Sequence, residues 1–199
     1  MKPAASLRWL VEEEAVRLAV WSAYSPAHRT ELGSTALGME GKWWFFDPIP
    51  LEEPALATLL ARGEPAGVVL TNANHEREAP AFASRFGVPL YAAAPHTCAF
   101  PAEAPERLAG LEVFPLEGAA EGERAFYHRA AGILILGDAL IHLADTGFTF
   151  LPDRYCLDPA RMRQSLRALA RLSPRWTTFA HGAPLAGAAP LRALVAGGG

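Results

Sequence analysis

Two polar residues stand at the ends of predicted strands, where a sheet would present them at one edge. Asp138 follows the apolar run at 132–137, and His181 ends a strand-like segment that begins at 175 and precedes Gly182. The edge at which strands end is where α/β folds place functional groups. A carboxylate and an imidazole at such an edge can transfer protons or bind a metal ion. Alternatively, Asp138 and His181 hydrogen-bond to each other and only tie two strand ends together.

A denser polar segment follows the apolar run at 66–70. It reads TNANHER from Thr71 and offers amides, an imidazole, a carboxylate and a guanidinium. His75 either faces the pocket as an acid or base or lies on the surface, and for a lone histidine we expect the surface position. The pocket candidates are therefore Asn72, Asn74, His75, Glu76, Arg77, Asp138 and His181.

Strand and helix patterns alternate along the chain. Aromatic and β-branched residues predict strands within 15–24 and 41–49. The second strand ends at Asp47, because the proline that follows cannot continue a central strand. Helical spacing follows at 51–62, and a strand–helix–strand unit is expected over 66–92. Further strands are predicted at 111–116, 123–128, 132–138 and 175–182, and a helix with Asp158 as its N-cap at 158–172. This alternation indicates a layered α/β domain.

Composition narrows the class of protein. The chain has 199 residues, of which 51% are hydrophobic and 20% charged, as in an ordinary globular protein, and we expect one domain over 1–199. A net charge of −3 with scattered arginines argues against a nucleic-acid partner. No secretory signal or membrane-spanning run is visible, so we expect a cytoplasmic protein without a membrane partner. Cys98 and Cys156 have neither disulfide nor zinc-site spacing. A small-molecule ligand and a homo-oligomer stay open.

Four segments in order resemble the metallo-β-lactamase superfamily, whose members are mostly hydrolases. They cover 31–51, 68–92, 132–140 and 177–185. The resemblance implies a four-layer αββα sandwich in which Asp138 is the metal-bridging aspartate and His181 the last metal histidine. It also implies hydrolysis of an ester, thioester, lactam or phosphoester by a metal-bound hydroxide.

The ligands that the resemblance implies are largely replaced. Where the family's loop reads H-x-H-x-D-H, the four ligand positions hold Asn72, Asn74, Glu76 and Arg77. The position of a third histidine corresponds to Ala119. Because a neutral amide oxygen is a weak zinc donor, we expect no dinuclear zinc centre.

Two interpretations of the remaining groups follow. In the favoured interpretation, the pocket holds no metal. The Arg77 guanidinium then takes the place of the metal ion and hydrogen-bonds to both Glu76 and Asp138. In the other, Glu76, Asp138 and His181 bind a single zinc, iron or manganese ion, with His75 as an acid or base.

The function expected from these interpretations is that of a degenerate superfamily member. Such a protein is expected to bind a small molecule or a partner in the cleft that holds the active site in the superfamily. The alternative is an active hydrolase of an ester, thioester or phosphoester that uses a single metal ion, so enzymatic activity itself is left open.

Overall fold

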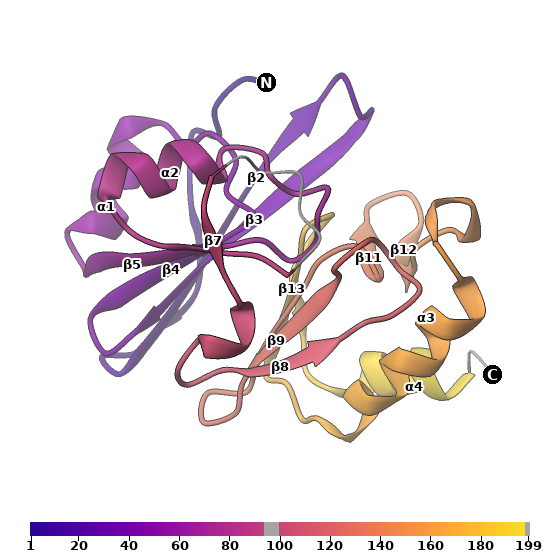
Figure 1. Ribbon diagram of the computed structural model, residues 1–199. Helices are drawn as coiled ribbons and strands as arrows, with labels where there is room; N and C mark the ends of the chain where they lie inside the picture. Colours follow the sequence, from indigo (N-terminus) through magenta and orange to yellow (C-terminus); the bar gives the residue numbers. More distant parts are fainter. Residues whose placement is uncertain (94–99, 198–199) are drawn as a thin grey trace.

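Two β-sheets lie face to face, with helices on both outer faces (Figure 1). The structure is a computed structural model and describes residues 1–93 and 100–197. Helices α1 and α2 cover the sheet of the N-terminal half, and α3 and α4 cover the other (Figure 1). This αββα arrangement confirms the predicted fold. Cys98 lies outside the described residues.

The first sheet runs in chain order from β1 to β7. Its strands are β1 (Arg8–Glu12), β2 (Val16–Ser25), β3 (Thr30–Met39), β4 (Lys42–Phe46), β5 (Glu64–Val69), β6 (Leu90–Tyr91) and β7 (Ala102–Glu103). The pairs from β1 to β4 are antiparallel and those from β4 to β7 are parallel. Helices α1 (Glu53–Leu60) and α2 (Ala79–Phe86) therefore make the crossovers that parallel strands require.

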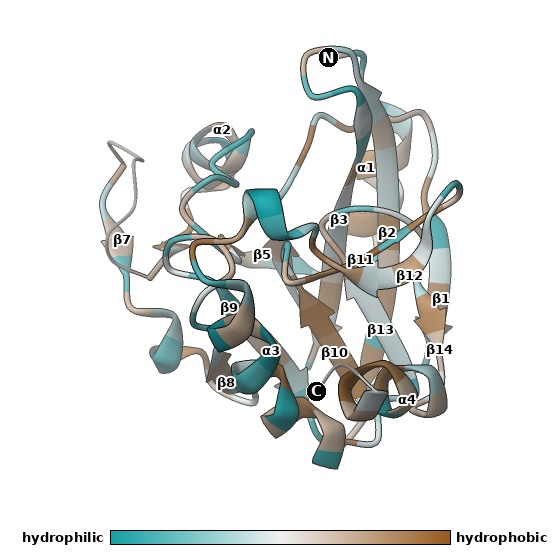
Figure 2. Cartoon of the chain, turned by 90° about the vertical axis from the view of Figure 1, so that its right-hand side faces the viewer, coloured by the Kyte–Doolittle hydropathy of each residue, from teal (hydrophilic) through white to brown (hydrophobic). Residues whose placement is uncertain are grey.

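The second sheet has the order β14-β13-β10-β9-β8. Its strands are β8 (Glu112–Pro115), β9 (Arg124–His128), β10 (Ile133–Leu136), β13 (Trp176–Phe179) and β14 (Leu185–Ala186). Helices α3 (Pro159–Leu166) and α4 (Ala189–Gly197) pack on its outer face. Figure 2 shows the apolar strand β10 in the interior and hydrophilic residues along α3. Strands β10 and β13 run parallel, so their carboxyl ends meet at one edge.

Aromatic residues fill the space between the layers. Phe46 and Phe126 meet between the two sheets with ring centroids 5.2 Å apart, and Phe45 packs on Phe82 of α2 at 5.4 Å. Trp43, Phe45 and Phe46 are almost fully buried, whereas Trp44 is half-buried.

Some elements differ from the predictions. Asp158 does cap α3, since its side chain accepts a hydrogen bond from the Arg161 N–H, but the α-helix ends at Leu166 and continues as a 3₁₀ helix. A further hairpin, β11 (Leu140–Leu143) with β12 (Gly147–Phe150), was not among the predicted strands and carries His142. Within the described residues, no helix is long and apolar enough to span a bilayer.

Candidate metal centre

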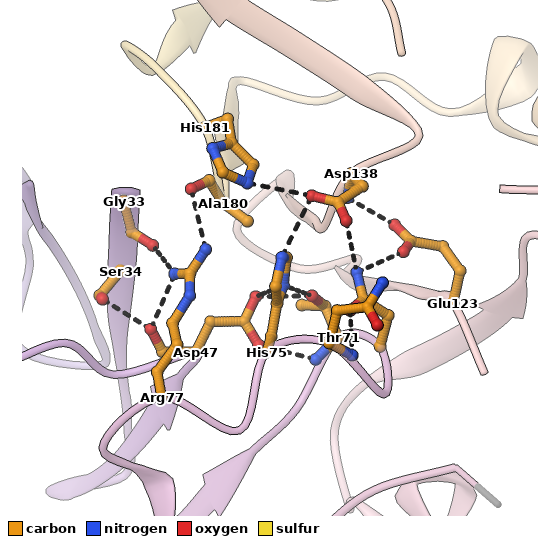
Figure 3. Close-up of polar contacts among 12 residues, drawn as sticks. Gly33, Ser34, Asp47, Thr71, His75, Arg77, Glu123, Asp138, Ala180 and His181 are labelled. Carbon is orange, nitrogen blue, oxygen red and sulfur yellow. Dashed lines mark hydrogen bonds and ion pairs between the residues drawn. The ribbon is translucent and has the colours of Figure 1, made fainter. Parts of the chain in front are cut away.

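Three chain segments meet at the edge where β5, β10 and β13 end. The loop that follows β5 carries His75, Asp138 follows β10, and His181 follows β13. Figure 3 shows the three side chains pointing toward one another. Their donor atoms all lie within 4.8 Å of one another. The structure thus contains a His/Asp/His group that could hold a metal ion.

Both imidazoles present Nε2 to the same oxygen. Asp138 Oδ1 lies 3.1 Å from His75 Nε2 and 3.2 Å from His181 Nε2. The side chain of His75 is 4% exposed, while those of Asp138 and His181 are 14% and 18% exposed. The group is therefore reached from solvent on the side of Asp138 and His181.

The other ring nitrogen of each histidine is already engaged. His75 Nδ1 lies 2.9 Å from Asp47 Oδ2, and His181 Nδ1 lies 3.0 Å from the carbonyl oxygen of Glu31. A carboxylate and a carbonyl only accept, so each Nδ1 must donate its proton. Such partners fix the tautomer and ring orientation of metal-binding histidines. In the neutral ring, Nε2 is then left with a lone pair.

Asp138 Oδ1 is consequently in an unusual position. Within the part of the chain that the structure describes, this buried oxygen has no hydrogen-bond partner, and its contacts with the two Nε2 atoms are those of ion pairs. The lone pairs of the two Nε2 atoms repel the Asp138 oxygen that they face. A proton or a metal ion between these atoms would remove the repulsion. Burial opposes charging of the His75 ring, but the carboxylates of Asp138 and Asp47 outweigh it and raise the pKa of His75 to about 9. A proton can therefore take this place when no metal does.

Thr71 completes the support of His75. Its hydroxyl donates to Asp47 Oδ2 at 2.5 Å, and its backbone N–H donates to Asp47 Oδ1 at 2.8 Å. Burial is the largest single influence and raises the pKa of Asp47, but the charge and hydrogen bond of His75, the charge of Arg77 and the hydrogen bond of Thr71 together outweigh it and leave that pKa below its usual value. Asp47 is thus an ionised residue behind His75, fixed by the end of β5.

Glu123 is a functional candidate that the sequence did not reveal. Its Oε1 accepts the backbone N–H groups of Asp138 and Ala139 at 2.8 and 3.2 Å. Burial, together with the charge of Asp138, raises the pKa of Glu123 to about 8. The only sequence signal is a carboxylate at the first position of the strand predicted at 123–128.

Asn72 occupies the space between two carboxylates. Its Nδ2 donates to Glu123 Oε2 at 2.7 Å and to Asp138 Oδ2 at 3.1 Å. An amide with two N–H groups can bridge two acceptors in this way. Ala119, which corresponds to a family histidine, is buried in the second core cluster and offers no donor. Asn72 therefore does part of the work that was predicted for Arg77.

The predicted fork of Arg77 between Glu76 and Asp138 is wrong. Arg77 Nη1 donates to the carbonyl oxygens of Gly33 and Asp47 at 2.7 and 3.2 Å, and Nη2 donates to that of Ala180 at 3.3 Å (Figure 3). Its φ of 40° is in the left-handed region, which is strained for a residue with a side chain. Arg77 links the two sheets through their backbones and acts on the carboxylates only through space.

The remaining candidates separate clearly. Glu76, predicted as a ligand of a single metal, does not belong to the His/Asp/His group, and His75 takes that place. His75 is buried, where a surface position was expected. Asn74 is exposed, and its backbone N–H donates to Asn72 Oδ1 at 2.9 Å. Asp138 and His181 lie in the group as predicted.

The layers define an αββα sandwich with a candidate metal-binding group at one edge of its sheets. The chain belongs to the metallo-β-lactamase superfamily, whose family model matches residues 14–181. A comparison with curated proteins gave no match.

Solved structures show the same fold at low sequence identity. The chain is similar to TMB-1, with a TM-score of 0.68 and 16% identity over 97% of this chain and 98% of that one. It is similar to the metallo-β-lactamase FIM-1 from Pseudomonas aeruginosa in its mono-zinc form, with a TM-score of 0.69 and 16% identity over 98% and 96%. A metallo-β-lactamase from Erythrobacter litoralis matches with a TM-score of 0.69 and 16% identity over 96% and 97%.

Proposed function

We propose that this chain is a hydrolase that binds one divalent metal ion through His75 Nε2, Asp138 and His181 Nε2. The observation that carries the proposal is the buried Asp138 Oδ1, which faces two imidazole nitrogens and has no hydrogen-bond partner among the described residues. Two imidazoles and a carboxylate with open positions are a ligand set that zinc and iron accept. The bond hydrolysed would be that of an ester, thioester or phosphoester, as in the superfamily.

The surrounding residues suit this role. A bound metal would supply Lewis acidity and lower the pKa of a bound water. Asp47 and the carbonyl of Glu31 keep both Nε2 atoms turned toward Asp138. The partial exposure of Asp138 and His181 gives a substrate its route to the group, whereas the buried His75 closes the opposite side.

A second metal ion is not part of the proposal. The amide of Asn72 already bridges Glu123 and Asp138, and Asn74 is exposed. FIM-1, which shares the fold, has been described in a mono-zinc form. The centre is thus degenerate relative to a dinuclear one, and its single site uses His75 where Glu76 was expected.

Metal analysis tests the proposal directly. The chelator-treated protein is dialysed against zinc, manganese or ferrous iron, and bound metal is measured per chain. About one ion per chain is expected, and His75→Gln and His181→Gln should each lose at least tenfold in affinity, the usual order for lost metal contacts. Glu76→Gln and His128→Gln are matched controls that should bind like the wild type.

A second candidate function is a metal-free binding module. It is favoured by the raised pKa of His75, since an imidazolium between Asp47 and Asp138 balances their charges without a metal. If none of the three metals binds the wild type, or if His75→Gln binds as well as the wild type, the metal proposal is overturned and this candidate replaces it.

A further inference from the structure

A separate cavity of about 230 Å³ lies between the first sheet and the segment that follows β13. It is lined by β1, β2 and β3 on one side and by Thr178 and 182–184 on the other. None of the three proposed metal-binding residues lines it. The cavity nevertheless shares a strand with the metal centre, because Glu31 lines it and also accepts the hydrogen bond of His181 through its carbonyl.

The sheet register shows which side chains face this cavity. Leu18 and Leu37 are paired and lie in the core between the sheets. Two residues further along, Val20 and Thr35 are paired on the same face, and Thr35 hydrogen-bonds Thr178 of the opposite sheet at 2.9 Å. Side chains alternate between the two faces along each strand, so the pair Ser22 and Gly33 lies on this face as well. The pair Tyr24 and Glu31, two residues further on, follows on the same face.

Arg8 and Glu31 therefore project from the same face. Arg8 is paired with Val20, and Glu31 is paired with Tyr24, four residues further along β2. At about 3.3 Å per residue, these positions are separated by roughly 13 Å along the strand. Ser22 and Gly33 are paired between them. A cation and an anion thus stand at opposite ends of the cavity.

Neither charge is used within the described residues. The side chains of Arg8 and Glu31 form no hydrogen bond or ion pair there, in contrast to Arg62, which pairs with Glu12. Gly33 packs closely against the second sheet, since a Cβ at this position would lie 2.7 Å from the carbonyl oxygen of Phe179. The volume corresponds to about eight water molecules at ~30 Å³ each.

We propose that this cavity binds a small zwitterion whose two charges are separated by several bonds, such as a dipeptide or an ω-amino acid. Its carboxylate would lie at Arg8 and its ammonium group at Glu31, with the Ser22 hydroxyl between them. A guanidinium recognises carboxylates through paired N–H groups, which gives the ligand its direction. The proposal does not depend on the metal centre.

Calorimetric titration of the metal-free protein with glycylglycine and 4-aminobutyrate tests it. A chelator is kept in solution, because these ligands also bind metal ions. Binding in the millimolar range or tighter is expected. Arg8→Gln and Glu31→Gln should each weaken it about tenfold or more, whereas Glu14→Gln, which changes an exposed charge elsewhere, should not.

Ligands with one charge removed separate the two ends. N-acetylglycylglycine lacks the ammonium group and should bind the wild type and Glu31→Gln equally weakly. Glycylglycinamide lacks the carboxylate and should bind the wild type and Arg8→Gln equally weakly. Urea unfolding of each variant shows that it is folded. Absence of binding to the folded wild type, or equal binding by the wild type and both charge variants, overturns the proposal. Neither result bears on the metal content of His75, Asp138 and His181.

Discussion

The guanidinium of Arg77 donates a hydrogen bond to the carbonyl oxygen of Ala180, at 3.3 Å, across the interface between the two sheets. Ala180 directly precedes His181. The same guanidinium holds two carbonyls of the first sheet, so the loop that carries His75 is connected to the strand end that carries His181. The relative position of the two imidazoles therefore depends on a residue that touches neither of them through a hydrogen bond.

Removing this connection should destabilise the protein. In Arg77→Ala, three carbonyls lose a charged donor, and hydrogen bonds to charged groups contribute about 1.5–3 kcal/mol each. Because such contributions overlap, we expect a loss of about 2–4 kcal/mol in urea unfolding at neutral pH. Arg154→Ala, on the exposed surface, should change stability by less than about 0.5 kcal/mol. Equal stability of the two variants would show that the connection contributes nothing.

Stability of the metal-free protein should fall as the pH rises from about 6.5 to 9. The folded pKa values of His75 and Glu123 are raised to about 9 and about 8, so the folded state binds more protons than the unfolded state in this window. Each retained proton gives a slope of about −1.4 kcal/mol per pH unit, and the contribution is complete below the unfolded pKa. Urea unfolding with chelator at several pH values measures it. Glu123→Gln should make the slope shallower, and an unchanged slope would exclude Glu123 from the titration.

A carboxylate at position 72 should repel the two carboxylates that the Asn72 amide now bridges. Asn72→Asp removes the donor that bridges Glu123 and Asp138 and places a third carboxylate beside them. We expect the metal-free protein to lose about 1–3 kcal/mol at pH 8, with zinc or manganese restoring part of it. Thermal unfolding with and without the ion measures both effects. Asn74→Asp, at an exposed position, is the control, and equal behaviour of the two variants would contradict this account of Asn72.

Gly137 should tolerate no side chain. A Cβ there would lie 2.5 Å from Thr71 Oγ1 and 2.6 Å from Glu123 Oε1, so the neighbours must move. Gly137→Ala should therefore cost about 1–3 kcal/mol, as overpacking does, and weaken metal binding by displacing Asp138. Gly197→Ala meets nothing within 4 Å and should leave both quantities unchanged. Metal affinity and urea unfolding of both variants test this.

Periodicity predicted a layered α/β domain with Asp138 and His181 at strand ends, whereas the αββα sandwich and the ligand roles of these two residues were implied by the resemblance to the superfamily. Apolar runs locate buried strands, and parallel strands place their ends together, which brought out Asp138 and His181. The path of the chain after Thr71 could not be predicted in this way. Arg77 adopts a left-handed backbone conformation, and His75 turns inward while Asn74 turns out, so the family's ligand spacing no longer identifies the inward-facing residue.

Glu123 was missed for a different reason. Its role depends on a contact between two strands that are adjacent in space, where Gly137 leaves room for its carboxylate beside the backbone N–H of Asp138. No local pattern records such a contact. A buried carboxylate in an otherwise apolar strand region becomes recognisable only when its hydrogen-bond partners are known.

The three proposed metal donors come from both halves of the chain, with His75 on the first sheet and Asp138 and His181 on the second. If these residues bind a metal ion as proposed, an N-terminal half still on the ribosome contributes only His75 of the three donors. Stable metal binding would then require that both sheets have formed and docked. Metal binding would thus report that the two halves of the domain have come together.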